Sequence, residues 1–183
     1  MSRSSRHKDY LVWLDLEMTG LDPAKHTIME IGTVVTDNTL KVIAEGPALA
    51  IHLPESALKG MDSWCVEHHG KSGLTDRCRK SRISMAQAEA RTLEFLKKHI
   101  EPDQSPLCGN SIWQDRRFLI KYMPKLNAFF HYRIVDVSSI KELVHRWYPR
   151  SAHAPEKKNT HHVMDDIYES IDELKFYRRA IFK

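Results

Sequence analysis

Two carboxylates stand where a strand of the hydrophobic core is expected. Asp15 and Glu17 lie within an apolar, strand-like run that spans residues 10–18. Side chains alternate between the two faces of a strand, so these acids share one face while Leu14 and Leu16 share the other. Uncompensated buried charge is costly, and hard divalent cations prefer carboxylate oxygens. The spacing therefore indicates a cation site; the alternative is an edge strand with two solvated acids.

Three more titratable candidates lie far along the chain. Asp115 falls in the early part of a helix expected at 112–122, where the alternative role is a capping or dipole-stabilising acid. His161 precedes the last helix, and histidine titrates near neutral pH. It stands near Asp165 and Asp166, which makes it a functional candidate, although a lone histidine before a helix is usually structural or exposed. If His161 were already helical, Asp165 would share its face and Asp166 would not.

Composition predicts an ordinary globular protein. The chain has 183 residues, 42% hydrophobic and 28% charged, with a formal net charge of +4 and a pI of about 8.9. Such a mildly basic chain permits a polyanionic partner without requiring one. We expect one domain over residues 10–183, preceded by a disordered basic tail at 1–9 that lacks the apolar segment of a signal peptide. No apolar stretch reaches membrane-spanning length.

The cysteines favour a cytoplasmic location. Cys65, Cys78 and Cys108 are widely spaced and form no Cys-x-x-Cys pair, so a zinc site or redox dithiol is not expected. A sparse, odd set of cysteines fits a reducing compartment.

Hydrophobic periodicity and turn residues predict the elements that position these candidates. Strands are expected at 10–18, 28–36 and 40–45, an extension at 49–53, and short strands near 106–109 and 133–136. Helices are expected at 55–60, 62–68, 84–99, 112–122, 137–147 and from the 161–166 region to Ile181. Ser84 and Gln87 form a capping-box pattern, Pro102 and Pro124 should end helices, and 149–160 should be a loop. The order predicts an α/β or α+β sandwich with a mixed sheet, three antiparallel strands being followed by parallel ones.

The candidates together resemble the DEDDh class of 3′→5′ exonucleases. Asp15-x-Glu17 is similar to the first motif of that class, Asp115 after Asn110-Ser111 to the second, and His161 with Asp166 to the third. Longer stretches resemble the oligoribonuclease family: Asp-Leu-Glu-Met-Thr-Gly-Leu-Asp-Pro at 15–23, Cys-Gly-Asn-Ser at 108–111, Gln-Asp-Arg-Arg-Phe-Leu at 114–119, Phe-His-Tyr-Arg at 130–133 and Met-Asp-Asp-Ile at 164–167.

This resemblance implies a fold and a mechanism. The fold would be α/β, a ribonuclease H-like mixed five-stranded sheet flanked by helices. Asp15, Glu17, Asp115 and Asp166 would hold two divalent cations, Mg²⁺ or Mn²⁺, for an in-line displacement at phosphorus. His161 would be the general base, in the loop before the last helix.

The resemblance also implies a substrate and a partner. Members degrade short RNA, chiefly dinucleotides, from the 3′ end to 5′-mononucleotides, and they are homodimers. By analogy Leu21 would wedge between the bases and Trp64 would line the pocket, where the alternative is a core aromatic residue. Ser111, Arg133 and Ser138 would cap the 5′ phosphate, with His131 and Tyr132 reaching across from the other protomer. Ser138 could also be a helix N-cap.

One residue departs from the family pattern. Trp113 stands two residues before Asp115, where many members carry a small residue, and it could either fill space beside the pocket or point to solvent. Two other functions are compatible with the same motifs. One is an exonuclease for longer DNA or RNA, and the other is a catalytically silent nucleic-acid-binding module on the same fold.

Overall fold

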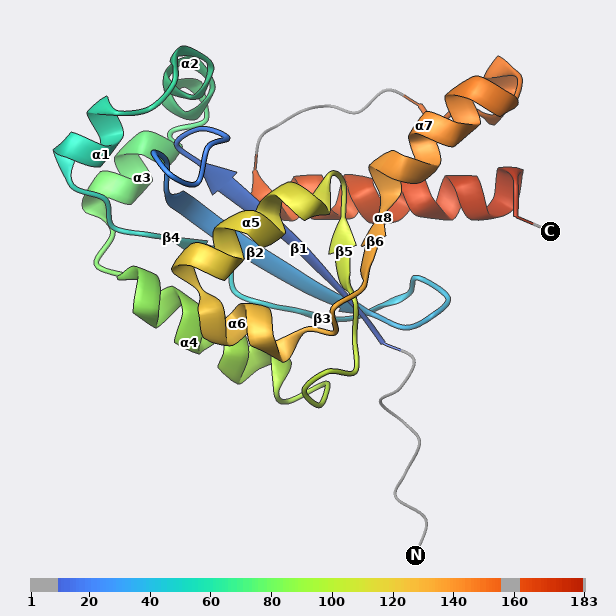
Figure 1. The fold of residues 1–183 in the computed structure, drawn as a ribbon, viewed down its shortest axis with the longest axis horizontal. Coiled ribbons are helices and arrows are strands. Elements are labelled where there is room, and N and C mark those ends of the chain that lie inside the picture. The colour runs from blue at the N-terminus through green and yellow to red at the C-terminus, as the bar shows by residue number, and fades with distance from the viewer. Residues whose placement is uncertain (1–9, 156–161, 183) are drawn as a thin grey trace, which may run out of the picture.

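The computed structural model describes residues 10–155 and 162–182, and a mixed sheet forms its centre (Figure 1). The main path of the sheet runs β3-β2-β1-β5-β6, and β4 pairs with β2 as a sixth strand. Pairing is antiparallel between β1, β2 and β3 and parallel between β1, β5 and β6, which confirms the predicted mixed sheet, although it has six strands instead of the expected five. The strands are β1 (Leu11–Met18), β2 (Ile28–Thr36), β3 (Val42–Glu45), β4 (Leu49–Ala50), β5 (Leu107–Gly109) and β6 (Ile134–Asp136).

Helices cover both faces of this sheet and create two hydrophobic cores. The larger core contains residues of α1, α3, α4, α5 and α6, and the smaller one contains residues of α7 and α8. None of the described helices is long and apolar enough to cross a membrane. The helices are α1 (Glu55–Lys59), α2 (Ser63–Lys71), α3 (Leu74–Lys80), α4 (Met85–Leu96), α5 (Ile112–Tyr122), α6 (Pro124–Phe129), α7 (Val137–Trp147) and α8 (Val163–Ala180), with a 3₁₀ turn η1 (Arg150–Ala152).

Strand β1 divides its side chains between the two cores as alternation requires. Leu14 and Leu16 belong to the larger core, whereas Trp13 belongs to the smaller one, against α7 and α8. Because Asp15 and Glu17 have the parity of Trp13, they point to the face that α8 covers. The prediction that both acids share one face is therefore confirmed.

Several predicted boundaries need correction. The capping box of Ser84 and Gln87 is present, but α4 ends at Leu96 rather than at residue 99. Helix α3 was not anticipated in the segment before residue 80, and neither was α6. Pro124 does follow the end of α5, but it also begins α6, since proline at the first helical position sacrifices no intrahelical hydrogen bond. The predicted tail at 1–9 lies outside the described residues and stays a prediction.

Candidate active site

The site begins where β1 extends beyond its parallel neighbour. The pairing of β5 with β1 ends at Trp13, so the following part of that edge needs other hydrogen-bond partners. Asp115, in the first turn of α5, supplies one: its Oδ1 accepts the backbone N–H of Leu16 at 3.0 Å. The Asp115 carboxylate is thus tied to the backbone between Asp15 and Glu17. Asp115 therefore makes a specific tertiary contact in addition to lying in the first turn of α5.

A glycine lets α8 approach the other side of these acids. Gly32 of β2 lies opposite Asp15 in the strand register. A Cβ atom at Gly32 would lie 2.8 Å from Cγ2 of Val163 and 3.2 Å from Sδ of Met164. The start of α8 therefore packs directly on the β2 backbone, and Asp166 in its first turn comes to the acids of β1.

Three of the four predicted acids form a compact cluster. One carboxylate oxygen each from Asp15, Glu17 and Asp166 lie within 4.8 Å of one another, the one such group found among the described residues. An all-oxygen donor set suits Mg²⁺ or Mn²⁺ better than softer metals, so these residues fit a hard divalent cation. Asp115 is outside this group of three but approaches through Leu16. Asp165 is exposed and is not part of this group, whereas Asp166 is.

The cluster is strongly acidic and partly buried. Burial raises the pKa of Glu17 to about 8, and the charges of Asp166, Glu30 and Asp115 add to this effect while Arg77 opposes it. Burial likewise raises the pKa of Asp115. Carboxyl groups that resist ionisation together are those that a divalent cation would stabilise in the charged form.

The predicted general base falls in a part of the chain that the structure does not describe. His161 lies outside the described residues, so its placement stays a prediction. The next residue, His162, is the N-cap of α8, and its carbonyl accepts the N–H of Asp166 at 3.0 Å. The backbone turn immediately after His161 therefore carries one acid of the cluster.

A pocket of about 400 Å³ opens beside Glu17. Leu21 and Trp64, both predicted to contact substrate, line it together with Asp62, Cys65 and His69. Leu21 is 65% exposed and Trp64 is 51% exposed, so neither side chain is buried in the hydrophobic core. The alternative of a core aromatic residue at Trp64 is wrong.

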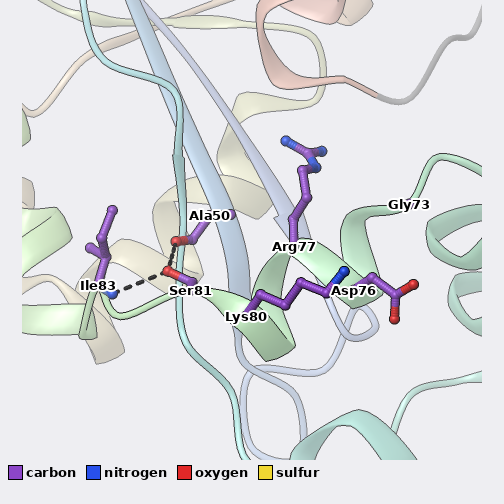
Figure 2. A pocket seen from close by; sticks show the side chains of 7 residues that line it. All are labelled: Ala50, Gly73, Asp76, Arg77, Lys80, Ser81 and Ile83. Atoms are coloured by element: carbon purple, nitrogen blue, oxygen red, sulfur yellow. Dashed lines mark hydrogen bonds between the residues drawn. The ribbon is translucent and has the colours of Figure 1, made fainter.

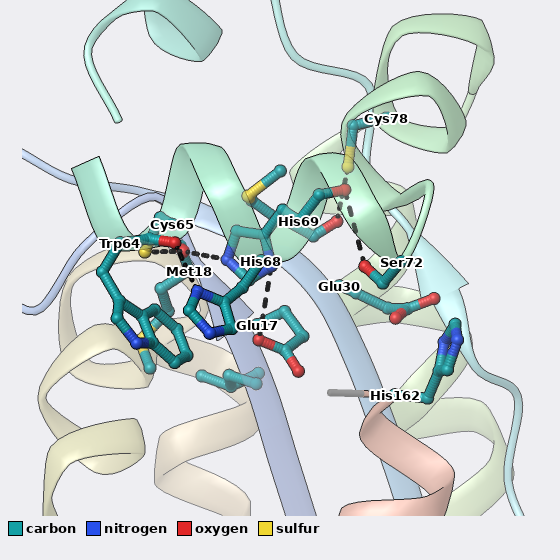
Figure 3. A network of polar contacts seen from close by, with 12 residues as sticks. Glu17, Met18, Glu30, Trp64, Cys65, His68, His69, Ser72, Cys78 and His162 are labelled. Atoms are coloured by element: carbon teal, nitrogen blue, oxygen red, sulfur yellow. Dashed lines mark hydrogen bonds and ion pairs between the residues drawn. The ribbon is translucent and has the colours of Figure 1, made fainter. Parts of the chain in front are cut away.

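His69 connects this pocket to the acids and was not anticipated. Its buried ring lies with Nε2 2.9 Å from the carbonyl oxygen of Met18 and Nδ1 3.8 Å from Oε2 of Glu17 (Figure 3). The histidine thus helps to fix the Glu17 side chain from α2. Nothing in the sequence distinguishes His69 from its neighbour His68, which stacks on Trp64 with ring centroids 3.8 Å apart.

The two serines predicted to cap a phosphate lie together. The N–H of Ser111 donates to Oγ of Ser138 at 3.0 Å, and the two hydroxyl oxygens are 3.2 Å apart. Asp136 organises the pair, since its Oδ1 accepts the N–H of Ser111 at 3.0 Å and that of Ser138 at 2.9 Å. Asp136, rather than Ser138, is therefore the N-cap of α7.

Arg116 of α5 anchors the segment that carries His131, Tyr132 and Arg133. The sequence did not indicate this role for Arg116. Nη1 of Arg116 donates to the carbonyl oxygens of His131 at 3.0 Å and Tyr132 at 2.9 Å. The Arg133 guanidinium lies 5.2 Å from the centre of the Tyr132 ring, which is 71% exposed. Arg116 directly follows Asp115, so one helix positions both the acid and this segment.

Trp113 is largely exposed to solvent. Its ring is 53% exposed, and the guanidinium of Arg117 lies 5.8 Å from its centre. Of the two alternatives considered for this residue, exposure to solvent is correct.

Comparison with known proteins defines the class first. The model of the Exonuclease family, RNase_T, matches residues 12–174. The fold is similar to that of exonuclease I in its apo form, with a TM-score of 0.74 and 16% identity over 94% of this chain and 42% of that one. For the zinc-bound complex of E. coli exonuclease I with single-stranded DNA, the TM-score is 0.73 and the sequence identity is 16%, over 93% of this chain and 40% of that one. The protein is an exonuclease with the predicted ribonuclease H-like α/β fold.

Curated relatives narrow the class to one family. The chain is 58% identical to the oligoribonuclease of Marinobacter nauticus over 96% of this chain and 97% of that protein. It is 56% identical to the oligoribonuclease of Vibrio cholerae and 55% identical to that of Pseudomonas aeruginosa, each over 94% of this chain and 96% of the relative. The chain belongs to the oligoribonuclease family.

Proposed function

We propose that this chain, a 3′→5′ exoribonuclease acting on short RNA, degrades dinucleotides above all and releases 5′-mononucleotides. The single observation that carries the proposal is the spacing of two features on α5. Ser111, the N-cap of α5, and Asp115 are separated by about one helical turn, or about 6 Å along the axis. In our proposal the one nucleotide between the 5′ phosphate and the scissile phosphate of a dinucleotide spans this short separation.

The acids supply the reaction centre in this proposal. Asp15, Glu17, Asp115 and Asp166 would hold two cations, Mg²⁺ or Mn²⁺, which stabilise charge on the attacking and leaving oxygens. The convergence of three of these carboxylates within 4.8 Å supports that assignment. His161 would accept the proton of the attacking water, in keeping with its ordinary titration range.

In our proposal, residues that contact the bases and residues that contact the 5′ phosphate together select a substrate of two nucleotides. Leu21, 65% exposed on the pocket wall, would separate the two bases, and Trp64 would pack beside one of them. Ser111, Ser138 and Arg133 would bind the 5′ phosphate, since a guanidinium fork can donate two parallel hydrogen bonds to phosphate oxygens. A 5′ phosphate enclosed in this way leaves no path for a longer strand.

A second protomer completes the site in our proposal. His131 and Tyr132 would reach into the partner's site from the segment that Arg116 anchors. A group of exposed apolar side chains on and beside β6 and α7 supports a homodimer: Tyr132, Ile134, Leu143, Trp147 and Tyr148. We expect Trp147→Glu to dissociate the dimer in light scattering and to lower dinucleotide hydrolysis together with it.

We also propose that residues 10–183 form one exonuclease domain in the cytoplasm. Both cores are built on the same sheet, which supports a single domain. The three cysteines are free and buried, and burial raises the pKa of Cys65 and Cys78 to about 12, as expected for inert thiols in a reducing compartment.

The test is hydrolysis of 5′-phosphorylated ribo-oligomers of two to seven nucleotides with Mg²⁺ or Mn²⁺. We expect the two-mer to disappear fastest, and Arg133→Ala to slow it far more than it slows hydrolysis of a generic phosphodiester. Arg146→Ala is the matched control, because Arg146 is an exposed arginine of α7 that pairs with Glu142. Equal rates on longer strands would instead show a general 3′→5′ exonuclease.

A further inference from the structure

A second buried carboxylate lies beside the acidic cluster and is held by an arginine. Glu30 of β2 is 2% exposed and pairs with Glu17 in the antiparallel register, so both side chains lie on the same face of the sheet. Arg77 of α3 donates to it with both guanidinium ends, Nη1 to Oε1 at 2.5 Å and Nη2 to Oε2 at 3.2 Å. Both carboxylate oxygens of Glu30 accept hydrogen bonds from the Arg77 guanidinium, so Glu30 binds Arg77 rather than a cation.

Arg77 also reaches the beginning of α8. Its Nη2 donates to Nδ1 of His162 at 3.4 Å, and Figure 3 shows His162 near Glu30 on the side of the sheet that carries Glu17. His162 is the N-cap of α8, and its carbonyl accepts the N–H of Asp166 at 3.0 Å. A continuous series of contacts therefore runs from buried Glu30 through Arg77 and His162 to the backbone of Asp166.

We propose that Arg77 is a positioning residue for the start of α8, which it holds in register with β1 and β2 so that Asp166 meets Asp15 and Glu17. The proposal deepens the proposed function and rests on it for the catalytic consequence. The physical reason is that helix ends fray, and the side chain of His162, the described N-cap residue, makes no capping hydrogen bond to α8. A guanidinium fixed by a buried carboxylate can restrain this end of the helix instead.

The neighbouring charged residues of α3 cannot do the same. Arg77 and Lys80 both line a shallow pocket of about 550 Å³, but Figure 2 shows their side chains leaving α3 in different directions. Arg79 pairs with Glu55 at 2.5 Å and with Asp76, both on exposed surface. Arg79 is therefore a matched control: it is an arginine of the same helix, and its ion pairs with Glu55 and Asp76 do not involve α8.

The experiment compares Arg77→Gln with Arg79→Gln in the full-length protein. Metal-free amide exchange gives a readout that does not depend on activity. We expect Arg77→Gln to speed exchange at the Asp166 amide about tenfold relative to amides of β2, as for the loss of one charge-assisted hydrogen bond. We expect kcat on the two-mer to fall about 10- to 100-fold with KM changed much less, since residues that orient ligands have effects of this size. Arg79→Gln should leave both readouts unchanged.

A double variant separates positioning from simple loss of stability. Arg77→Gln alone leaves Glu30 as an uncompensated buried charge, which destabilises the whole sheet. In Glu30→Gln/Arg77→Gln that charge is gone, so thermal stability should recover while Asp166 exchange stays fast and kcat stays low. Recovery of kcat together with stability would overturn the proposal, and so would Asp166 exchange in Arg77→Gln that matches Arg79→Gln. A wild-type protein inactive on two-mers would refute the proposed function and leave the exchange comparison valid.

Discussion

Replacing Gly32 with alanine should displace the start of α8 and thereby lower activity, although Gly32 itself is not one of the acids. The new Cβ would lie 2.8 Å from Cγ2 and 3.1 Å from Cβ of Val163, whereas carbon atoms in contact normally lie about 3.5–4.0 Å apart. Val163 must therefore retreat by about 0.7 Å or more, and because it is β-branched and 1% exposed it cannot rotate away. Overpacking of this kind costs about 1–3 kcal/mol of stability. The displaced turn carries Asp166, and a misplacement of about 1 Å can cost about 100-fold in rate.

The assay combines two-mer hydrolysis, Mn²⁺ titration and urea unfolding of Gly32→Ala, Val163→Ala and the double variant. The double variant removes the 2.8 Å contact with Cγ2 but keeps the 3.1 Å contact with Cβ of residue 163, so activity and stability should exceed the additive expectation by part of the overpacking cost, about 1 kcal/mol. Gly70→Ala is the control, because nothing lies within 4 Å of a Cβ built at Gly70 in α2. Wild-type behaviour of Gly32→Ala, or failure of Val163→Ala to rescue it, would refute the view that this contact sets the position of α8.

Three further variants probe other contacts of the site. In the metal-free protein, the pKa of Glu17 is about 8 against an ordinary value of 4.5, so the folded state holds this proton more tightly than the unfolded state does. Its unfolding free energy should therefore fall as the pH rises between these values, by up to about 5 kcal/mol in urea titrations, and Glu17→Gln should flatten the slope. Gln114→Leu should raise KM for the two-mer more than it lowers kcat, because Nε2 of Gln114 holds the carbonyl oxygen of Leu21 at 2.5 Å. Asp136→Ala should cost about 1 kcal/mol in thermal unfolding through the lost N-cap, and it should weaken two-mer binding by releasing the N–H of Ser111.

Local patterns in the sequence were sufficient for most elements of the fold. Strand β2 and helix α5 have the predicted bounds, because β2 is a run rich in β-branched residues that ends at a turn and α5 ends at a proline. Alternation along β1 correctly placed Asp15 and Glu17 on one face. The errors lie in short elements such as α3 and α6, whose lengths of 7 and 6 residues are too short for a helical period to be recognised.

The acids of the site could also be predicted from the sequence, whereas most of the residues that position these acids could not. Glu30 could have been recognised by the criterion that found Asp15, since it interrupts the apolar residues of a core strand. Arg77 and His69 could not, because each is one charged or polar residue among many on a surface-facing helix, and its importance depends on a contact across the fold. The role of Gly32 depends likewise on Val163, which is distant in sequence.

Helix α5 explains why these separate groups can act as one site. Within its first turns, Asp115 holds the β1 backbone at Leu16, Gln114 holds the loop that carries Leu21, and Arg116 holds the carbonyls of residues 131 and 132. Consecutive helical residues point in directions about 100° apart, so three neighbours can reach three separate segments. If Leu21 separates the bases and residues 131–133 enclose the 5′ phosphate, the allowed substrate length is set by a rigid helix rather than by flexible loops. Helix α5 then determines both the substrate length that the site accepts and the position of Asp115.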